Sequence, residues 1–419
     1  MDTAHQSATA ATDAAFPVMR LRQLFPALRN GFVFFDNAAG AQVPQPVLDR
    51  VQHHLVHCNA QRGGRYAMSQ AVDTAIREAR QAVADFLNAA DPSEVSFGMN
   101  GTSFLRLISL GIGQDLGARR EIVVTDSDHE ANIAPWLALV QAGAVLRWWH
   151  AGEDGRLSLA ELERLLSPRT RVVACAAASN ATGTIHDLAG VAGRAHAAGA
   201  EVVVDAVHYG PHGPLDVQAA GIDYLACSGY KIFGPHMGFM WGRREALLRL
   251  PTFREAFIPD VPPDKIEAGT FMYENVAGMD AAIGYLSTLG PPNRDLARAD
   301  QLHAAMARIQ DYEAVLSRRA IAVLRRARAR IYGESEETES GRRVPTFLFT
   351  LEGRSPQDVV THLAARGIGA RDGHMYAPRL MRRLGLSEDR GGVRISLVHY
   401  NTEAEIERFG AALMELQQS

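Results

Sequence analysis

Hydrophobic residues along the chain follow two alternating patterns. Short continuous runs of valine, alanine and isoleucine, at 121–125, 171–178 and 201–204, are typical of strands buried on both faces of a sheet. Between the runs, apolar residues recur every three or four positions, which is typical of amphipathic helices. The alternation predicts an open α/β fold whose mainly parallel sheet is covered by helices on both faces, with ligands beyond the carboxyl ends of the strands.

The pattern changes after about residue 280. A long Ala/Arg/Leu helical pattern runs from about 296 to 330, and it is followed by a strand, a helix and a further strand ending near residue 402. We therefore expect a large domain at 16–280, whose N-terminal segment packs on a smaller α+β domain at 281–419. Residues 1–15 are expected to form a disordered tail. The charged stretch 333–343 is expected to be solvated surface.

Composition narrows the classes of function. The chain has 419 residues, a net charge of -4 and 47% hydrophobic residues, so nothing in its charge favours nucleic acid or membrane as a partner. No apolar run is long enough to span a bilayer, and the first thirty residues do not resemble a secretory signal. The three cysteines lie far apart. The histidines at 53, 54 and 57 and at 208 and 212 have spacings that a metal could use, but no carboxylate or cysteine cluster accompanies them. We expect a cytoplasmic protein without a metal site.

The scarcity of lysine directs attention to one position. Of 43 basic residues only Lys231 and Lys265 are lysines. A lysine amine can lose its proton and form a Schiff base with a carbonyl, which arginine cannot do. Lys265 lies in a proline-rich loop and is expected to be a surface charge. Lys231 follows a strand, and Asp205 ends the strand before it. An amine and an anion at adjacent strand ends are what pyridoxal phosphate requires, to hold its aldehyde and to keep its pyridine nitrogen protonated.

The segment 202–242 around these two residues resembles the core of the class V aminotransferase family of fold-type I pyridoxal-phosphate enzymes. It resembles most closely the branch of cysteine desulfurases and selenocysteine lyases. Further matches occur in family order, including "FFDNAAGAQVP", "FGMNGTSFLRLI", "DHEANIAPW", "ASNATGT" and "GVRISLVHYNT". The resemblance implies a large domain with a mainly parallel seven-stranded sheet, a smaller α+β C-terminal domain, and bound pyridoxal 5'-phosphate.

The resemblance also implies roles for individual residues. Lys231 would carry the cofactor, Asp205 would face its ring nitrogen and His129 would stack on its ring. The other expected cofactor contacts are with the phosphate (Gly101, Thr102, Ser103 and Ser228) and with the phenolic oxygen (Asn180 and His208, the latter in place of the usual glutamine). Gly269 and Thr270 would complete the phosphate site of the partner subunit, which implies a homodimer.

Substrate contacts are expected from arginines. Arg394 matches the family residue that forks onto a substrate α-carboxylate, which implies an α-amino acid as substrate. Arg371 is a second candidate. The segments expected to line the pocket are basic and aromatic, which favours a larger or anionic side chain; they contribute Arg62, Arg65, Tyr66, His374 and Tyr376.

The sequence departs from the desulfurases at one position. Tyr376, preceded by Met375, stands where that branch has its nucleophilic cysteine. A phenol cannot accept a sulfur atom, but it can donate a proton to a leaving group. We therefore favour a C–S lyase that works by β-elimination, with Lys231, His129 and Tyr376 as catalytic residues. An aminotransferase, an isopenicillin-N-epimerase-like racemase and a non-catalytic cofactor-binding homologue stay open as alternatives.

Overall fold

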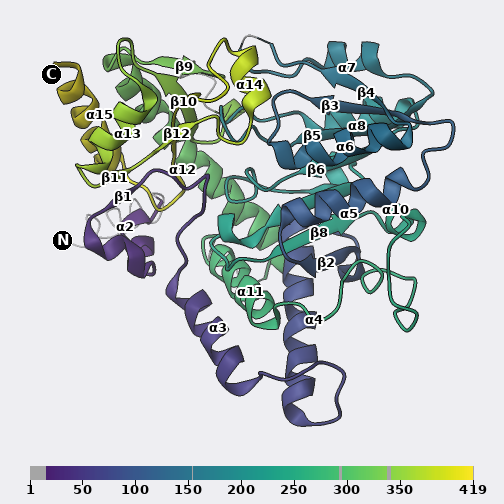
Figure 1. The fold of residues 1–419 in the computed structure, drawn as a ribbon. Coiled ribbons are helices and arrows are strands. Elements are labelled where there is room, and N and C mark those ends of the chain that lie inside the picture. Colours follow the sequence, from purple (N-terminus) through teal and green to yellow (C-terminus); the bar gives the residue numbers. More distant parts are fainter. Residues whose placement is uncertain (1–15, 153, 292–294, 337–340, 419) are drawn as a thin grey trace.

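The computed structural model describes residues 16–152, 154–291, 295–336 and 341–418 (Figure 1). The predicted tail at 1–15 lies outside the described residues. Seven strands form one sheet in the order β2-β8-β7-β6-β5-β3-β4. Only β8 runs antiparallel to its neighbours, so the predicted mainly parallel seven-stranded sheet is confirmed. The strands are β2 (Val95–Gly98), β3 (Glu121–Thr125), β4 (Val145–Trp149), β5 (Thr170–Ala176), β6 (Glu201–Asp205), β7 (Tyr224–Ser228) and β8 (Gly238–Gly242).

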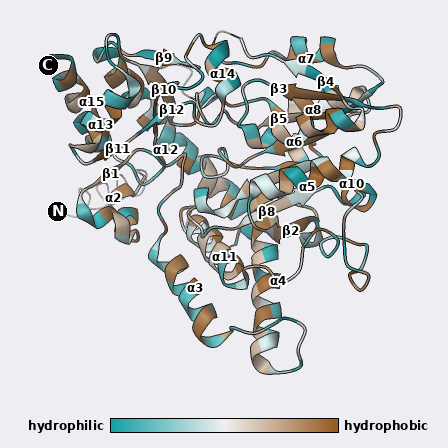
Figure 2. Ribbon diagram, viewed as in Figure 1, coloured by the Kyte–Doolittle hydropathy of each residue, from teal (hydrophilic) through white to brown (hydrophobic). Residues whose placement is uncertain are grey.

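Helices cover both faces of this sheet. One face packs against α4 (Ala67–Leu87), α8 (Leu188–Ala197), α11 (Tyr273–Ser287) and α12 (Arg298–Arg326), and the other against α5 (Gly101–Gly113), α6 (Ala134–Ala138) and α10 (Arg244–Arg249). The remaining helices of this region are α7 (Leu159–Leu165) and α9 (Val217–Ala220). In Figure 2 the hydrophobic colour is concentrated on the central strands, whereas α3 (Gln45–His57) and α4 carry both colours.

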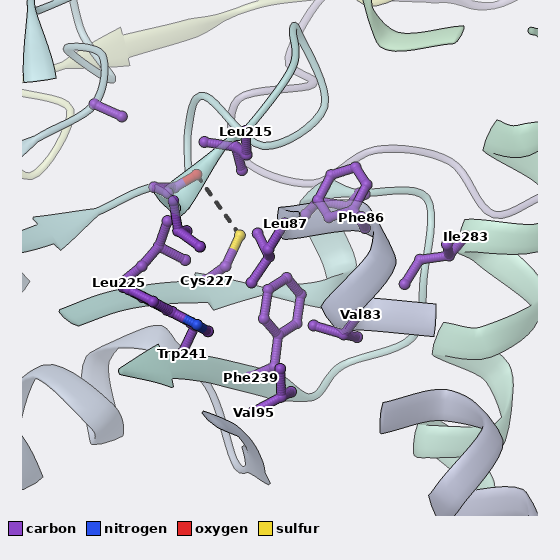
Figure 3. Packing of buried hydrophobic residues seen from close by; sticks show 14 of the residues in the cluster. Val83, Phe86, Leu87, Val95, Leu215, Leu225, Cys227, Phe239, Trp241 and Ile283 are labelled. Atoms are coloured by element: carbon purple, nitrogen blue, oxygen red, sulfur yellow. Dashed lines mark hydrogen bonds between the residues drawn. The ribbon is translucent and has the colours of Figure 1, made fainter. Parts of the chain in front are cut away.

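Consecutive residues of a strand enter opposite cores because side chains alternate along it. In β6, Val202 and Val204 belong to the cluster under α4 and α11, while Val203 belongs to the cluster under α5. Figure 3 shows the first of these clusters, in which side chains of α4 pack against β7 and β8. Cys227 is fully buried there, 3.6 Å from the carbonyl oxygen of Ala206. Strands hydrophobic on both faces therefore read as continuous apolar runs.

A four-stranded antiparallel sheet, β12-β13-β10-β9, forms a second body with its own core. Its strands are β9 (Arg330–Tyr332), β10 (Thr346–Thr350), β12 (Arg371–Gly373) and β13 (Gly392–Ser396), and its helices are α13 (Pro356–Ala364), α14 (Pro378–Arg383) and α15 (Glu403–Gln418). The N-terminal segment reaches this body. After α2 (Val18–Arg22), strand β1 (Val33–Phe34) pairs in parallel with β11 (Ile368–Gly369).

Two expectations about charged residues are wrong. Lys265 is buried rather than exposed, with its Nζ 3.0 Å from Oδ1 of Asp260. The charged stretch 333–343 is not simply solvated, because Glu334 and Arg343 are buried. The Arg343 guanidinium lies 3.9 Å from the ring centroid of Phe347. Among the residues described, no helix is both long enough and apolar enough to cross a membrane.

Candidate active site

The carboxyl ends of β2, β5, β6 and β7 meet at one edge of the large sheet. Because β8 is antiparallel to both β2 and β7, those two strands run in the same direction, which brings the start of α5 beside the end of β7. A cavity opens at this edge. It is lined by Asn100, Thr102, His129, Ala131, Ala176, Asn180, Asp205, Val207, His208, Ser228, Tyr230 and Lys231. Most residues predicted to contact the cofactor are thus gathered in one place.

Lys231 and Asp205 face this cavity from adjacent strand ends. Lys231 lies in the short 3-10 turn Gly229–Lys231 after β7 and is buried. Burial, followed by the positive charge of Arg394, lowers the pKa of its amine to about 8. Burial raises the pKa of Asp205 to about 6, although its Oδ1 accepts a hydrogen bond of 2.9 Å from the Val207 amide. An amine that loses its proton easily is suited to react with the aldehyde of pyridoxal phosphate. A buried carboxylate is suited to pair with the protonated nitrogen of its ring.

The start of α5 forms a cradle suited to an anion. Helix N-termini offer free N–H groups and a positive dipole end. The Gly101 amide donates to Ser228 Oγ at 2.9 Å, and a Cβ at Gly101 would lie 2.6 Å from Val207 Cγ2. A side chain at this position would therefore require Val207 to move. Thr102 and Ser228 line the cavity, but Ser103 does not. Ser103 forms a capping box with Asn100, and its hydroxyl also donates to the Asn100 carbonyl at 2.7 Å.

His129 lines the cavity, and its ring lies against that of Tyr376, which is not among the lining residues. The pKa of His129 is lowered to about 4, first by burial and then by Lys231 and Arg394, so its ring is neutral at pH 7. Nδ1 accepts from the Ala131 amide at 2.9 Å, which leaves Nε2 as the N–H. The two ring centroids are 5.3 Å apart. Tyr376 is 56% exposed and has a φ of 58°, in the left-handed region that non-glycine residues rarely adopt.

Asn180 and His208 reach the cavity from the loops after β5 and β6. The Asn180 side-chain nitrogen donates to the Met375 carbonyl at 2.6 Å, and its Oδ1 has no partner within the part of the chain that is described. His208 Nε2 lies 3.1 Å from Thr346 Oγ1. Burial, followed by the charge of His212, holds the pKa of His208 well below its ordinary value, so this ring is neutral. Asn180 is thus hydrogen-bonded to the loop that carries Met375, and His208 to the first residue of β10, which fixes the orientation of both side chains.

The arginines predicted to bind substrate converge on a residue that sequence reasoning missed. Arg394 is buried, and its Nη2 lies 2.9 Å from Oδ1 of Asp36. Arg371 binds Oδ2 of the same carboxylate, at 2.9 Å from Nε and 2.7 Å from Nη2. Asp36 belongs to the "FFDNAAG" motif, which signalled the family but carried no chemical role in the sequence. Tyr230 and Asn100 were also missed, and both line the cavity.

Other predicted residues lie away from this cavity. Gly269 and Thr270 line a separate one together with Arg62 and Phe257. Thr270 Oγ1 accepts there from Gln61 Nε2 at 2.6 Å. Six further predicted side chains do not line the Lys231 cavity. They are Arg371, Arg394, Tyr376, the exposed Arg65 and Tyr66, and the half-buried His374, whose Nδ1 accepts from the Tyr376 amide.

The chain is similar to known proteins over nearly its whole length. The family model described as aminotransferase class-V matches residues 33–409. The chain is 34% identical over 413 residues to the aminotransferase-like protein FGM3 of Gibberella zeae, covering 96% of this chain and 99% of that one. It is also 34% identical to a probable cysteine desulfurase of Mycolicibacterium paratuberculosis, covering 96% of this chain but only 58% of that relative.

A solved structure is similar over nearly the whole length. The cysteine desulfurase of Thermococcus onnurineus NA1, in its apo form, superimposes with a TM-score of 0.86 at 28% identity, covering 96% of this chain and 98% of that one. The likeness includes both bodies of the fold.

Proposed function

Because the chain belongs to the class V aminotransferase family and is a pyridoxal-phosphate-dependent enzyme, we propose that it cleaves a C–S bond at the β-carbon of an α-amino acid. The observation that carries this proposal is the position of Tyr376. Its side chain is a phenol, it lies against His129, which lines the Lys231 cavity, and the resemblance in sequence implies that it occupies the position of the desulfurase cysteine.

Lys231 and Asp205 perform the proton chemistry in this proposal. Pyridoxal phosphate, when bound, supplies an aldehyde and an electron-withdrawing ring that stabilises negative charge at the substrate α-carbon. The Lys231 amine, with its pKa of about 8, loses its proton far more readily near neutral pH than an ordinary lysine does, so it would serve as the base that takes the substrate α-proton. The Asp205 carboxylate holds a proton at the ring nitrogen.

Tyr376 has the role of proton donor to the leaving group. The electron pair of the breaking Cα–H bond forms the Cα–Cβ double bond, and the electrons of the Cβ–S bond leave with sulfur. The Tyr376 hydroxyl protonates that sulfur, and water later hydrolyses the aminoacrylate product to pyruvate and ammonia. No thiolate takes part. Cys175 and Cys227 are fully buried within strands, and burial raises the pKa of both thiols.

The substrate carboxylate is assigned to Arg394. Its buried guanidinium lies beside the cavity, because Nη1 donates at 3.0 Å to the backbone carbonyl of Asn180, a residue that lines it. A planar guanidinium matches the geometry of a carboxylate. The second cation, Arg371, is partly exposed on β12, just before the loop that carries Tyr376. These charges favour an S-substituted cysteine with a larger or anionic side chain.

Product analysis tests the function. We expect the cofactor-loaded protein, incubated with S-substituted cysteines, to release a thiol together with pyruvate and ammonia in equal amounts. Replacing Tyr376 by phenylalanine should slow release of a poor leaving group by about a hundredfold, because one proton donor is lost, and should affect a good leaving group much less. A keto acid that keeps the substrate side chain would instead identify an aminotransferase. Inversion of the α-carbon without release of sulfur would identify a racemase.

We also propose that two copies form a dimer that shares its active sites. Gly269 and Thr270 do not reach the cavity of their own chain, and the nearby Phe253 and Phe257 are 102% and 82% exposed. Large aromatic side chains left in water on one loop are typical of a covered face. A molecular mass of twice 45.5 kDa in sedimentation equilibrium is expected, and a monomer at micromolar concentration would refute the proposal.

A further inference from the structure

Strand pairing places two arginines side by side. Arg371 of β12 and Arg394 of β13 are directly opposite each other in the antiparallel register, so their side chains leave the same face of the sheet. Like charges in this relation repel each other. The pair persists because Asp36 lies between the two guanidiniums, with Oδ1 bound to Arg394 and Oδ2 to Arg371.

The main chain fixes Asp36 in this position. Asp36 forms an isolated parallel bridge with Ser396, two residues beyond Arg394 on the same strand. The Ser396 amide donates to the Phe35 carbonyl at 2.7 Å. The side chain of Asn37 donates to the Ser396 carbonyl at 2.8 Å. The carboxylate and the guanidinium are therefore carried by backbones that are hydrogen-bonded to each other.

Within the described residues, one nitrogen of the buried Arg394 guanidinium has no hydrogen-bond partner. Nη1 donates to the Asn180 carbonyl and Nη2 to Asp36, but Nε, though buried, has no partner among the described residues. A buried N–H without an acceptor is unfavourable, and an acceptor is expected from outside the chain. The two satisfied nitrogens hold the plane of the guanidinium, so the direction of this remaining donor is defined.

We propose that Asp36 is a positioning residue for the substrate carboxylate. It fixes the Arg394 guanidinium so that Nε–H stays directed at the carboxylate, and it cancels one of the two adjacent positive charges. This inference rests on the proposed function, in which Arg394 binds that carboxylate. Asp36 acts through Arg394 and does not touch the substrate. In this role the position of the Asp36 carboxylate matters, because a negative charge placed elsewhere would not hold the Arg394 guanidinium in the same orientation.

Binding of an unreactive ligand tests the proposal without turnover. The probe is 3-(methylthio)propionate, which has the carboxylate of an S-substituted cysteine but no amine, and its amide serves as the uncharged reference. Both are titrated into the cofactor-loaded protein and followed by cofactor absorption. We expect Asp36→Asn to weaken binding of the carboxylate about tenfold and to leave the amide unchanged, because one charge-assisted hydrogen bond that orients Arg394 is lost.

Asp372→Asn is the matched control. Asp372 is exposed beside Arg371, where its charge helps to raise the pKa of that guanidinium. The substitution removes the same charge without freeing Arg394, so the carboxylate affinity should stay within about twofold of the wild type. If Asp36→Asn does not fold, Asp36→Glu replaces it. Glu keeps the charge but displaces it by one methylene, and weaker carboxylate binding is again expected.

The outcomes separate this inference from the proposed function. Arg394→Lys must itself weaken binding of the carboxylate relative to the amide, and if it does not, the assignment of the carboxylate site is wrong. If Arg394→Lys weakens binding while the Asp36 variants bind as well as wild type, or more tightly, only the positioning role is refuted. In the Arg394→Lys background, Asp36→Asn should have no further effect, because the group through which it acts is already gone.

Discussion

Replacing Lys231 by arginine is expected to abolish turnover, with a loss of about 10⁴-fold or more. Arginine keeps the positive charge and nearly the length of the side chain, but its guanidinium does not deprotonate and cannot attack an aldehyde. The covalent attachment and the base for the α-proton are lost together. Turnover of an S-substituted cysteine measures the effect, and mass spectrometry after borohydride reduction shows whether the cofactor is still attached.

Lys265→Arg is the control for this substitution, since the chain has only these two lysines. Lys265 is buried, but it lies in the loop after α10 and is paired with Asp260 rather than facing the cavity. The Lys265→Arg variant is expected to keep its cofactor attached. The melting temperature of this variant should also be measured, because a substitution at a buried site can destabilise the fold. Attachment of the cofactor at Lys265, or full turnover by Lys231→Arg, would contradict the proposed site.

The lowered pKa of Lys231 predicts how the rate of cofactor capture depends on pH. Its pKa is lowered to about 8, so the protein without cofactor should capture pyridoxal phosphate faster as the pH rises toward 8 and reach a plateau above it. An ordinary lysine, with a pKa of about 10.4, would show a rate that still rises beyond pH 9. Stopped-flow absorption measures the rate. A continued rise would mean that neither burial nor Arg394 perturbs this amine.

Asp205→Asn is expected to lower turnover by about 10²- to 10³-fold, since the preorganised charge that stabilises the protonated ring nitrogen is lost. Asn is nearly isosteric and can still accept from the Val207 amide, as Asp205 does now at 2.9 Å. The fold should therefore be retained, and the defect should lie in the chemical step. Exchange of the substrate α-proton with deuterated solvent measures that step directly.

Asp128→Asn is the matched control for Asp205. Asp128 is a second buried carboxyl whose pKa is raised to about 6 by burial, and its Oδ2 accepts from Asn132 at 2.7 Å. It does not line the cavity. The control should exchange the α-proton far faster than Asp205→Asn. Equal loss in both variants would show that total buried charge matters, and that no carboxylate has a special position at the ring.

The sequence was sufficient to predict the sheet and the residues at its strand ends. Buried strands appear as continuous apolar runs, and Asp205 and Lys231 directly follow two of them, so their convergence follows from parallel strand geometry. Asp36 and Arg343 could not be found in this way. The role of Asp36 depends on a backbone bridge to Ser396, which is 360 positions away. Arg343 is buried because its guanidinium stacks on the Phe347 ring and donates a hydrogen bond to the Thr182 carbonyl. A local pattern carries no information about such partners.

The loop of Tyr376 limits what a single substitution there could achieve. Met375 and Tyr376 both have left-handed φ values, the Glu130 amide donates to the Tyr376 carbonyl, and Asn180 holds the Met375 carbonyl. A sulfur carrier must swing between its donor and its acceptor, and an anchored turn has no such reach. Replacing Tyr376 by cysteine would place a thiol on a fixed support. Gaining sulfur transfer would therefore require a change of mobility as well as of chemistry, and a single mutational step does not supply both.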